Sequence, residues 1–209
     1  MSARIIDTHA DIAEGMAWLA ATCPRMAHAH SLTGPLPLRR RGDGFAELLA
    51  AILSQQVSVA SARAIRARLE AAGAVTEPAI AAMSEDDLRA LGLSRQKARY
   101  ARALATAGID YARLRHAPLP DIIATLTAVP GIGIWTAEIY AMFSLGRADV
   151  FAPGDLALQE AARMLYDLPE RPKERAFRQM AQAWSPWASV AAQTLWAYYH
   201  VRKTREGIA

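Results

Sequence analysis

The sequence predicts an all-α protein, a helical bundle without a sheet. Apolar residues recur at helical spacing in one segment after another, whereas the strict alternation that marks strands is almost absent. Short stretches with proline and glycine separate these segments at the lengths usual for connections between helices. The chain has 209 residues, of which 53% are hydrophobic, so it can bury a substantial core without help from cross-links.

The N-terminal part predicts one helix and a loop. A helix is expected over 8–22, ended by Cys23-Pro24, and the stretch 31–44 reads as a loop because it is rich in proline and glycine. Residues 1–44 should therefore add a helix and a loop to one lobe of the protein. The remaining helices are expected at 45–56, 58–72, 84–91, 94–107, 119–127, 134–145, 155–166, 172–183 and 186–202.

The helices within 119–145 form a hairpin around the turn Pro130-Gly131-Ile132-Gly133. Glycine allows positive φ and close approach to another backbone, and the second helix begins beside this turn with N–H groups that lack intrahelical partners. Such a turn can bind a phosphate of any sequence without a charged side chain. An ordinary turn between two helices is the alternative.

Charge and cysteine content limit the classes of function. The net charge is +4, and only three of the 24 basic residues are lysines, so arginine carries the charge. Arginine suits phosphates and bases, although a GC-rich genome also enriches it. The single Cys23 excludes an internal disulfide framework and a four-cysteine cluster. No apolar run reaches the roughly 18 residues that cross a bilayer, and we expect a soluble cytoplasmic protein.

Four segments, in this order, resemble the helix-hairpin-helix (HhH-GPD) DNA glycosylase superfamily, and within it the 3-methyladenine DNA glycosylase II branch. The resemblance covers about 45–202 and implies a single core over 1–209, a compact two-lobed helical bundle with a catalytic cleft between the lobes. It also implies a monomer that binds damaged double-stranded DNA in base excision repair. The segments are 52–58 (ILSQQVS), 126–137 (LTAVPGIGIWTA), 149–155 (DVFAPGD) and 184–187 (WSPW).

The resemblance makes Asp155 the catalytic carboxylate. At this place it would stabilise the cationic sugar as the glycosidic bond breaks and would position a water on C1′. An aspartate at the start of a helix is otherwise usually an N-cap. Bifunctional relatives form a Schiff base with a lysine in the second hairpin helix, where this chain has Trp135. We therefore expect hydrolysis without AP-lyase activity, and a structural role for Asp149.

The resemblance also implies a base pocket that includes Trp135 and Trp187, with a flipped purine stacked between them. An alkylated purine of the 3-methyladenine or 7-methylguanine type carries a positive charge, which a tryptophan face attracts. Ile139 and Leu156 stand where relatives can have tyrosines, so the pocket is expected to be wider or less selective. Trp184 and Trp196 are assigned to the core.

Gln55 and Gln56 match the place where relatives carry the wedge that fills the vacated position in the DNA stack. Gln56 is the candidate wedge, with Gln55 in support, and the alternative is that both lie on a helix surface. By the same resemblance, the backbone carbonyls of Thr127, Val129 and Ile132 could hold a monovalent cation such as Na⁺ or K⁺. No other cofactor, and in particular no iron–sulfur cluster, is expected.

Two other functions remain open. One is a non-catalytic helix-hairpin-helix module that binds DNA, which would need no carboxylate at position 155. The other is a glycosylase for another lesion, such as a mismatched or oxidised purine, with lyase activity. The residues that contact phosphates also remain open, because one face of helix 94–107 is either a DNA contact or merely solvated. This face carries Arg95, Lys97, Arg99 and Arg102.

Overall fold

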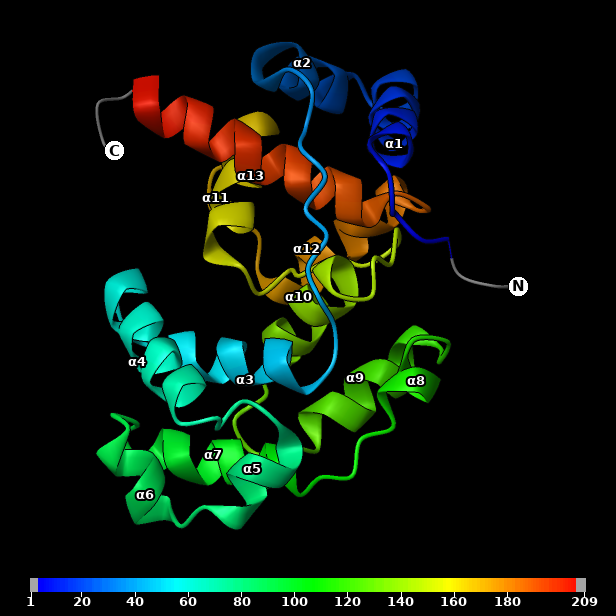
Figure 1. The fold of residues 1–209 in the computed structure, drawn as a ribbon. Coiled ribbons are helices and arrows are strands. Elements are labelled where there is room, and N and C mark those ends of the chain that lie inside the picture. Colours follow the sequence, from blue (N-terminus) through cyan, green and yellow to red (C-terminus); the bar gives the residue numbers. More distant parts are fainter. Residues whose placement is uncertain (1–3, 206–209) are drawn as a thin grey trace. The chain divides into compact units, whose positions relative to one another are not determined.

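The computed structural model describes residues 4–205, and this part of the chain forms 13 α-helices and one short 3-10 helix (Figure 1). The one isolated bridge in the described residues pairs Ile5 with Arg147. The all-α prediction is confirmed. No helix within 4–205 has the length and apolar character that crossing a membrane requires.

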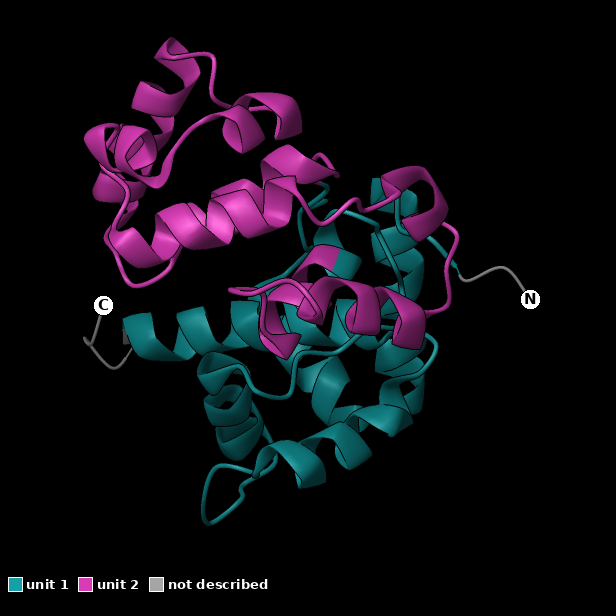
Figure 2. Ribbon diagram, turned by 90° about the horizontal axis from the view of Figure 1, so that it is seen from below, with its two compact units in different colours: residues 1–40, 141–209 teal, residues 41–140 magenta. Residues whose placement is uncertain are grey.

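The chain divides into two compact units, residues 1–40 with 141–209 (unit 1) and residues 41–140 (unit 2), which Figure 2 colours separately.

Unit 1 is built around its last helix, α13, which contacts α1, α2 and α11. Small residues on α13, among them Ala191 and Ala192, are fully buried and let these helices approach closely. Gly15 of α1 has the same effect, since a Cβ there would lie 2.7 Å from a ring carbon of Trp187. The helices of unit 1 are α1 (His9–Thr22), α2 (Pro24–Thr33), α11 (Leu156–Leu165), α12 (Glu174–Ala181), η1 (Gln182–Trp184) and α13 (Ala188–Arg205).

Unit 2 is organised around α7, which packs against α3, α5 and α6. Serine or threonine side chains cap the starts of several of its helices; for example, Ser84 and Asp87 form a reciprocal capping box at α6. The helices of unit 2 are α3 (Phe45–Ser54), α4 (Val59–Ala71), α5 (Glu77–Ala82), α6 (Glu85–Ala90), α7 (Arg95–Ala105), α8 (Tyr111–Leu114) and α9 (Leu119–Thr127). α10 (Ile134–Phe143) begins in unit 2 and ends in unit 1.

The structure corrects the expected N-terminal region. Cys23-Pro24 ends α1 but also begins a further helix, α2, because proline is tolerated in the first turn, where an N–H has no intrahelical partner. Met26 and Ala29 of α2 are buried in unit 1, so residues 1–44 contribute two helices instead of one. The last helix begins at Ala188, after Ser185-Pro186, and proline therefore does not lie in its first turn.

A buried tyrosine of unit 2 makes stability depend on pH. The Tyr140 hydroxyl accepts the Gly44 N–H at 2.7 Å, and burial raises the pKa of Tyr140 to about 12 from its ordinary value of 10.0. The neutral phenol is therefore favoured in the folded state, and its contribution is complete below pH 10 and is lost as pH rises toward 12. We expect about 2 kcal/mol of unfolding free energy to disappear across this window.

Tyr140→Phe should be less stable than wild type at pH 8 by about 1–2 kcal/mol, because the Gly44 N–H loses its acceptor. It should then lose less stability than wild type between pH 10 and pH 12, as measured by urea unfolding at each pH. Tyr199→Phe, at a half-exposed tyrosine of α13, is the control and should follow wild type. Parallel losses in wild type and Tyr140→Phe would contradict the assignment.

Candidate active site

Asp155 is held at the start of α11 by hydrogen bonds to one carboxylate oxygen. Its Oδ1 accepts the backbone N–H groups of Ala157 at 2.9 Å and Leu158 at 3.0 Å. The carboxylate is therefore an N-cap, as the structural alternative expected. The same oxygen also accepts the indole N–H of Trp196 at 3.2 Å. A cap needs no such third donor from a helix 41 residues away in the sequence, and this donor further restricts the carboxylate's orientation.

The loop that leads to Asp155 is fixed to α13. Ser189 is fully buried, and its hydroxyl lies 2.6 Å from the Arg147 carbonyl and accepts the Val150 N–H at 3.1 Å. Asp149 accepts the Ser185 hydroxyl at 2.6 Å, in agreement with the structural role expected for it. These hydrogen bonds restrain the segment 147–155 and so hold Asp155 on a rigid support.

Trp196 is a site residue that the sequence analysis assigned to the core. It lies in the middle of α13, is half-buried, and directs its indole N–H at Asp155. Its ring is also 5.9 Å from that of Phe143, which helps to hold it in place. The expected core position of Trp184 is confirmed, because its side chain is 1% exposed.

The expectation that Trp187 forms a wall of the base pocket is wrong. Its side chain is 2% exposed, the guanidinium of Arg4 lies 4.2 Å from its ring centroid, and Gly15 packs against its ring. A ring covered in this way cannot stack on a base. Trp187 immediately precedes α13, and Trp196 lies nine positions after it. At roughly 100° per residue this is two and a half turns, so only one of the two could face Asp155. The spacing alone does not show which one.

The turn of the helical hairpin lies in unit 2 and has the geometry that its glycines predict. α9 ends at Thr127, the Ile132 N–H donates to the Val129 carbonyl at 3.1 Å, and Gly133 accepts the first helical bond of α10. Gly131 has a φ of 94°, and a Cβ there would lie 2.4 Å from the ring of Tyr100. Both the backbone angle and the close packing therefore require glycine at this position.

The structure brings Gln55 to the hairpin. Gln55 is the C-cap of α3, and its Nε2 donates to the Gly131 carbonyl at 2.9 Å. Gln56 follows it with a φ of 54°, a left-handed conformation that is uncommon for a residue other than glycine, and its side chain is exposed. The two glutamines are therefore in the loop between α3 and α4, beside the turn, and not on a helix surface.

Large apolar side chains are exposed at two of the four expected pocket positions, Trp135 and Leu156. Trp135 is 48% exposed in the first turn of α10, and Ile139 follows it on the same helix face, four residues later and half-buried. Leu156 is 65% exposed next to Asp155. Unit 1 thus supplies a fixed carboxylate, and unit 2 supplies an exposed aromatic side chain and a glycine turn suited to phosphate.

The comparisons with known proteins agree with these features. Residues 49–186 match the family model described as HhH-GPD superfamily base excision DNA repair protein. The crystal structure of a DNA-3-methyladenine glycosidase from Bacillus halodurans is similar with a TM-score of 0.79 and 31% identity, over 94% of this chain and 91% of that one. The Schizosaccharomyces pombe 3-methyladenine DNA glycosylase, solved in complex with abasic DNA, is similar with a TM-score of 0.75 and 27% identity, over 92% and 97% of the two chains.

A Bacillus subtilis protein that is provisionally named as a DNA-3-methyladenine glycosylase is 34% identical over 121 residues. The match covers 56% of this chain and 42% of that protein, so this chain spans less than half of that relative's length. The family model nevertheless covers well over half of this chain, including the hairpin and Asp155. The chain therefore belongs to the HhH-GPD superfamily of base excision DNA repair proteins.

Proposed function

We propose that the protein is a monofunctional DNA glycosylase that hydrolyses the N-glycosidic bond of alkylated purines in damaged double-stranded DNA. The observation that carries the proposal is the fixed Asp155 carboxylate, held by the start of α11 and by Trp196. A binding module would need no such carboxylate. The names of the two solved relatives, both 3-methyladenine glycosylases, support the substrate class, and the abasic DNA bound to one of them supports a DNA partner.

Asp155 would act on the sugar after the base has left the stack. Its negative charge stabilises the oxocarbenium-like sugar, and as a general base it helps a water to attack C1′. The alkylated base is already cationic and is a good leaving group, so no strong acid is needed beside it. Trp135, with its exposed ring, would attract the cationic base by about 0.5–2 kcal/mol more than a neutral one.

Water is the proposed nucleophile because α10 contains no lysine that could form a Schiff base. We propose further that the hairpin turn binds a phosphate of the damaged strand and that the enzyme acts as a cytoplasmic monomer. The carbonyls of Thr127, Val129 and Ile132 offer oxygen donors of the kind that hard cations prefer, although Val129 already accepts one hydrogen bond. A monovalent cation held there would add positive charge near that phosphate.

The function is tested by incubating methylated duplex DNA with the wild-type protein. Chromatography measures the released bases, and gel electrophoresis measures strand breaks before and after alkali. We expect methylpurines to be released and breaks to form only after alkali, with neither result on unmethylated DNA. Breaks without alkali would indicate a lyase instead. Binding of the methylated DNA without release would indicate the non-catalytic module or a glycosylase for another lesion.

Trp196→Phe should lower the single-turnover rate of base release by about 10-fold to 100-fold. The substitution keeps an aromatic ring but removes the N–H that donates to Asp155, and a hydrogen bond to a charged group contributes about 1.5–3 kcal/mol. Trp187→Phe is the matched control, because it alters a buried tryptophan of the same unit that does not touch Asp155. Trp187→Phe should lower the melting temperature and have little effect on the single-turnover rate of base release. Equal rates for Trp196→Phe and wild type would remove Trp196 from the site.

A further inference from the structure

The loop that carries Gln56 has an unusual support at the end of α3. Leu53 is in the last turn of this helix, where carbonyl groups have no intrahelical partner. Its carbonyl accepts a hydrogen bond from the Lys97 ammonium at 2.6 Å. Lys97 is only 8% exposed, and its burial lowers the pKa of its side chain. The expectation that Lys97 lies on an exposed basic face of α7 is therefore wrong.

A buried ammonium is costly unless it is hydrogen-bonded, so a lysine in this place needs a reason. A leucine or methionine could fill the same space between α3 and α7 without that cost. What an apolar residue could not do is bind the Leu53 carbonyl and fix the direction in which the chain leaves α3. The next residues along the chain are Ser54, Gln55 and Gln56.

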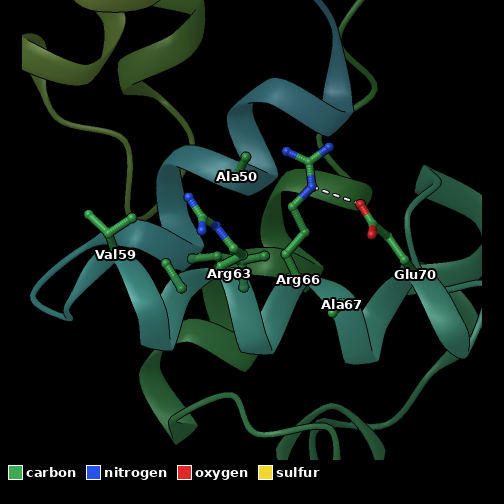
Figure 3. A pocket seen from close by; sticks show the side chains of 8 residues that line it. Ala50, Val59, Arg63, Arg66, Ala67 and Glu70 are labelled. Carbon is green, nitrogen blue, oxygen red and sulfur yellow. Dashed lines mark hydrogen bonds and ion pairs between the residues drawn. The ribbon is translucent and has the colours of Figure 1, made fainter.

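The other side of this helix end is open. A pocket of 490 Å³ lies along part of the contact between α3 and α4, and Leu53, Val59 and Arg63 are among the residues that line it. Figure 3 shows that Arg66 and Glu70, which form an ion pair beside the pocket, both belong to α4. Side chains from α4 therefore fill the space beside the end of α3 only in part. Contacts to other elements also position the loop.

Those contacts come from α7 and from the hairpin turn. Lys97 holds the Leu53 carbonyl, and Tyr100, one turn later on α7, packs against Gly131. Gln55 completes the connection through its hydrogen bond to the Gly131 carbonyl. Gln96 donates to the Tyr100 hydroxyl at 2.6 Å and fixes that side chain. One face of α7 thus supports both the loop with Gln55 and Gln56 and the turn around Gly131.

Gln56 itself has a left-handed backbone conformation, which is unfavourable for residues other than glycine. Such a conformation persists only where the surrounding structure enforces it, and it is enriched at functional sites. Because the Gln56 side chain is exposed, its own packing does not enforce this backbone conformation. The chain is fixed on both sides of Gln56, by the bond of Gln55 to the Gly131 carbonyl and by Ser58, which caps α4.

We propose that Lys97, through the Leu53 carbonyl, and Gln55, through the Gly131 carbonyl, hold Gln56 in the conformation that enters the DNA stack. Lys97 is thus a positioning residue for base extrusion, and it touches neither the base nor the sugar. The inference rests on the proposed glycosylase function, since a wedge is needed only where a base is extruded. A geometric error far from the reacting atoms can cost a large factor in rate.

The test measures extrusion separately from chemistry. A fluorescent 2-aminopurine beside the lesion brightens when stacking is lost, and stopped-flow mixing follows this change while chromatography follows base release. Lys97→Met and Gln55→Ala should slow extrusion at least about tenfold on a fully paired duplex. The defect should shrink when the lesion lies opposite an abasic site, because less stacking and pairing must then be lost. Lys97→Arg, which keeps a donor, should recover part of the loss.

Lys173→Met is the matched control, because it removes an exposed lysine outside the site and should match wild type. Melting temperatures show whether Lys97→Met has folded, and Gln55→Ala tests the same support without changing the core. Extrusion at wild-type rates in both variants, or an equal loss on both DNA substrates, would overturn the proposal. Extrusion that is slowed in both variants, but is followed by no base release even in wild type, would contradict the proposed function and still support the role of Lys97.

Discussion

Asp155→Asn should lower the rate of base release from methylated DNA by a factor of about 10² to 10⁴, the range for loss of a general base or of one electrostatic stabiliser. The fold should not change, because asparagine caps a helix as well as aspartate does and its Oδ1 can accept the same N–H groups. The substitution removes the negative charge and the general base. Single-turnover release, with enzyme in excess over DNA, measures the effect, and fluorescence anisotropy shows whether DNA affinity is retained.

Asp149→Asn is the control for this experiment. Asp149 lies on the same loop, is exposed, and accepts a hydrogen bond from Ser185, so its loss should affect the loop and not the chemistry. Its rate should remain within a few-fold of wild type. A rate for Asp155→Asn that matches wild type would mean that another group stabilises the sugar. Equal losses in the two variants would assign the effect to a displaced loop.

The sequence predicted local structure best where a few neighbouring residues determine it. Asp155 lies at the start of α11 and Gly131 lies in the turn, as expected, because a cap and a turn depend on a few neighbouring residues. Helices with several apolar turns were also predicted, often to within two residues. The short α5 and α8 were missed, because six and four residues are too few to establish a helical period. α6 is equally short and was predicted from its start, where Ser84 is followed by three acidic residues.

The choice among the tryptophans failed for a different physical reason. α13 is buried on nearly all sides between Ala188 and Leu195, so its hydrophobic pattern has no polar face that would orient the helix. Without that orientation, the sequence could not tell which of Trp187 and Trp196 faces Asp155. Lys97 was misplaced for a related reason. Its partner is the backbone carbonyl of Leu53, and every residue has such a carbonyl, so the sequence does not identify the partner.

Gly131→Ala should destabilise the protein by about 3 kcal/mol, the combined cost of a side chain at positive φ and of overpacking. The alanine Cβ would lie 2.4 Å from the Tyr100 ring, so the turn must move or the ring must leave its place. For a chain of this size the melting temperature should fall by about 10 °C. Adding Tyr100→Ala should recover only part of the loss, since it relieves the clash but not the backbone angle.

Gly133→Ala separates folding from DNA binding at the same turn. A Cβ at Gly133 meets no protein atom within 4 Å, so the melting temperature should stay close to that of wild type. The added methyl group would instead occupy the surface where a phosphate must approach the N–H groups of α10. Losing one hydrogen bond to a charged phosphate should weaken DNA binding about tenfold or more, as measured by anisotropy.

If Gly133→Ala bound DNA as tightly as wild type, the hairpin would be a structural turn, and the phosphate contact would have to be sought elsewhere. Weaker binding at unchanged stability would assign the two glycines different roles, with Gly131 required for the shape of the turn and Gly133 for access to it.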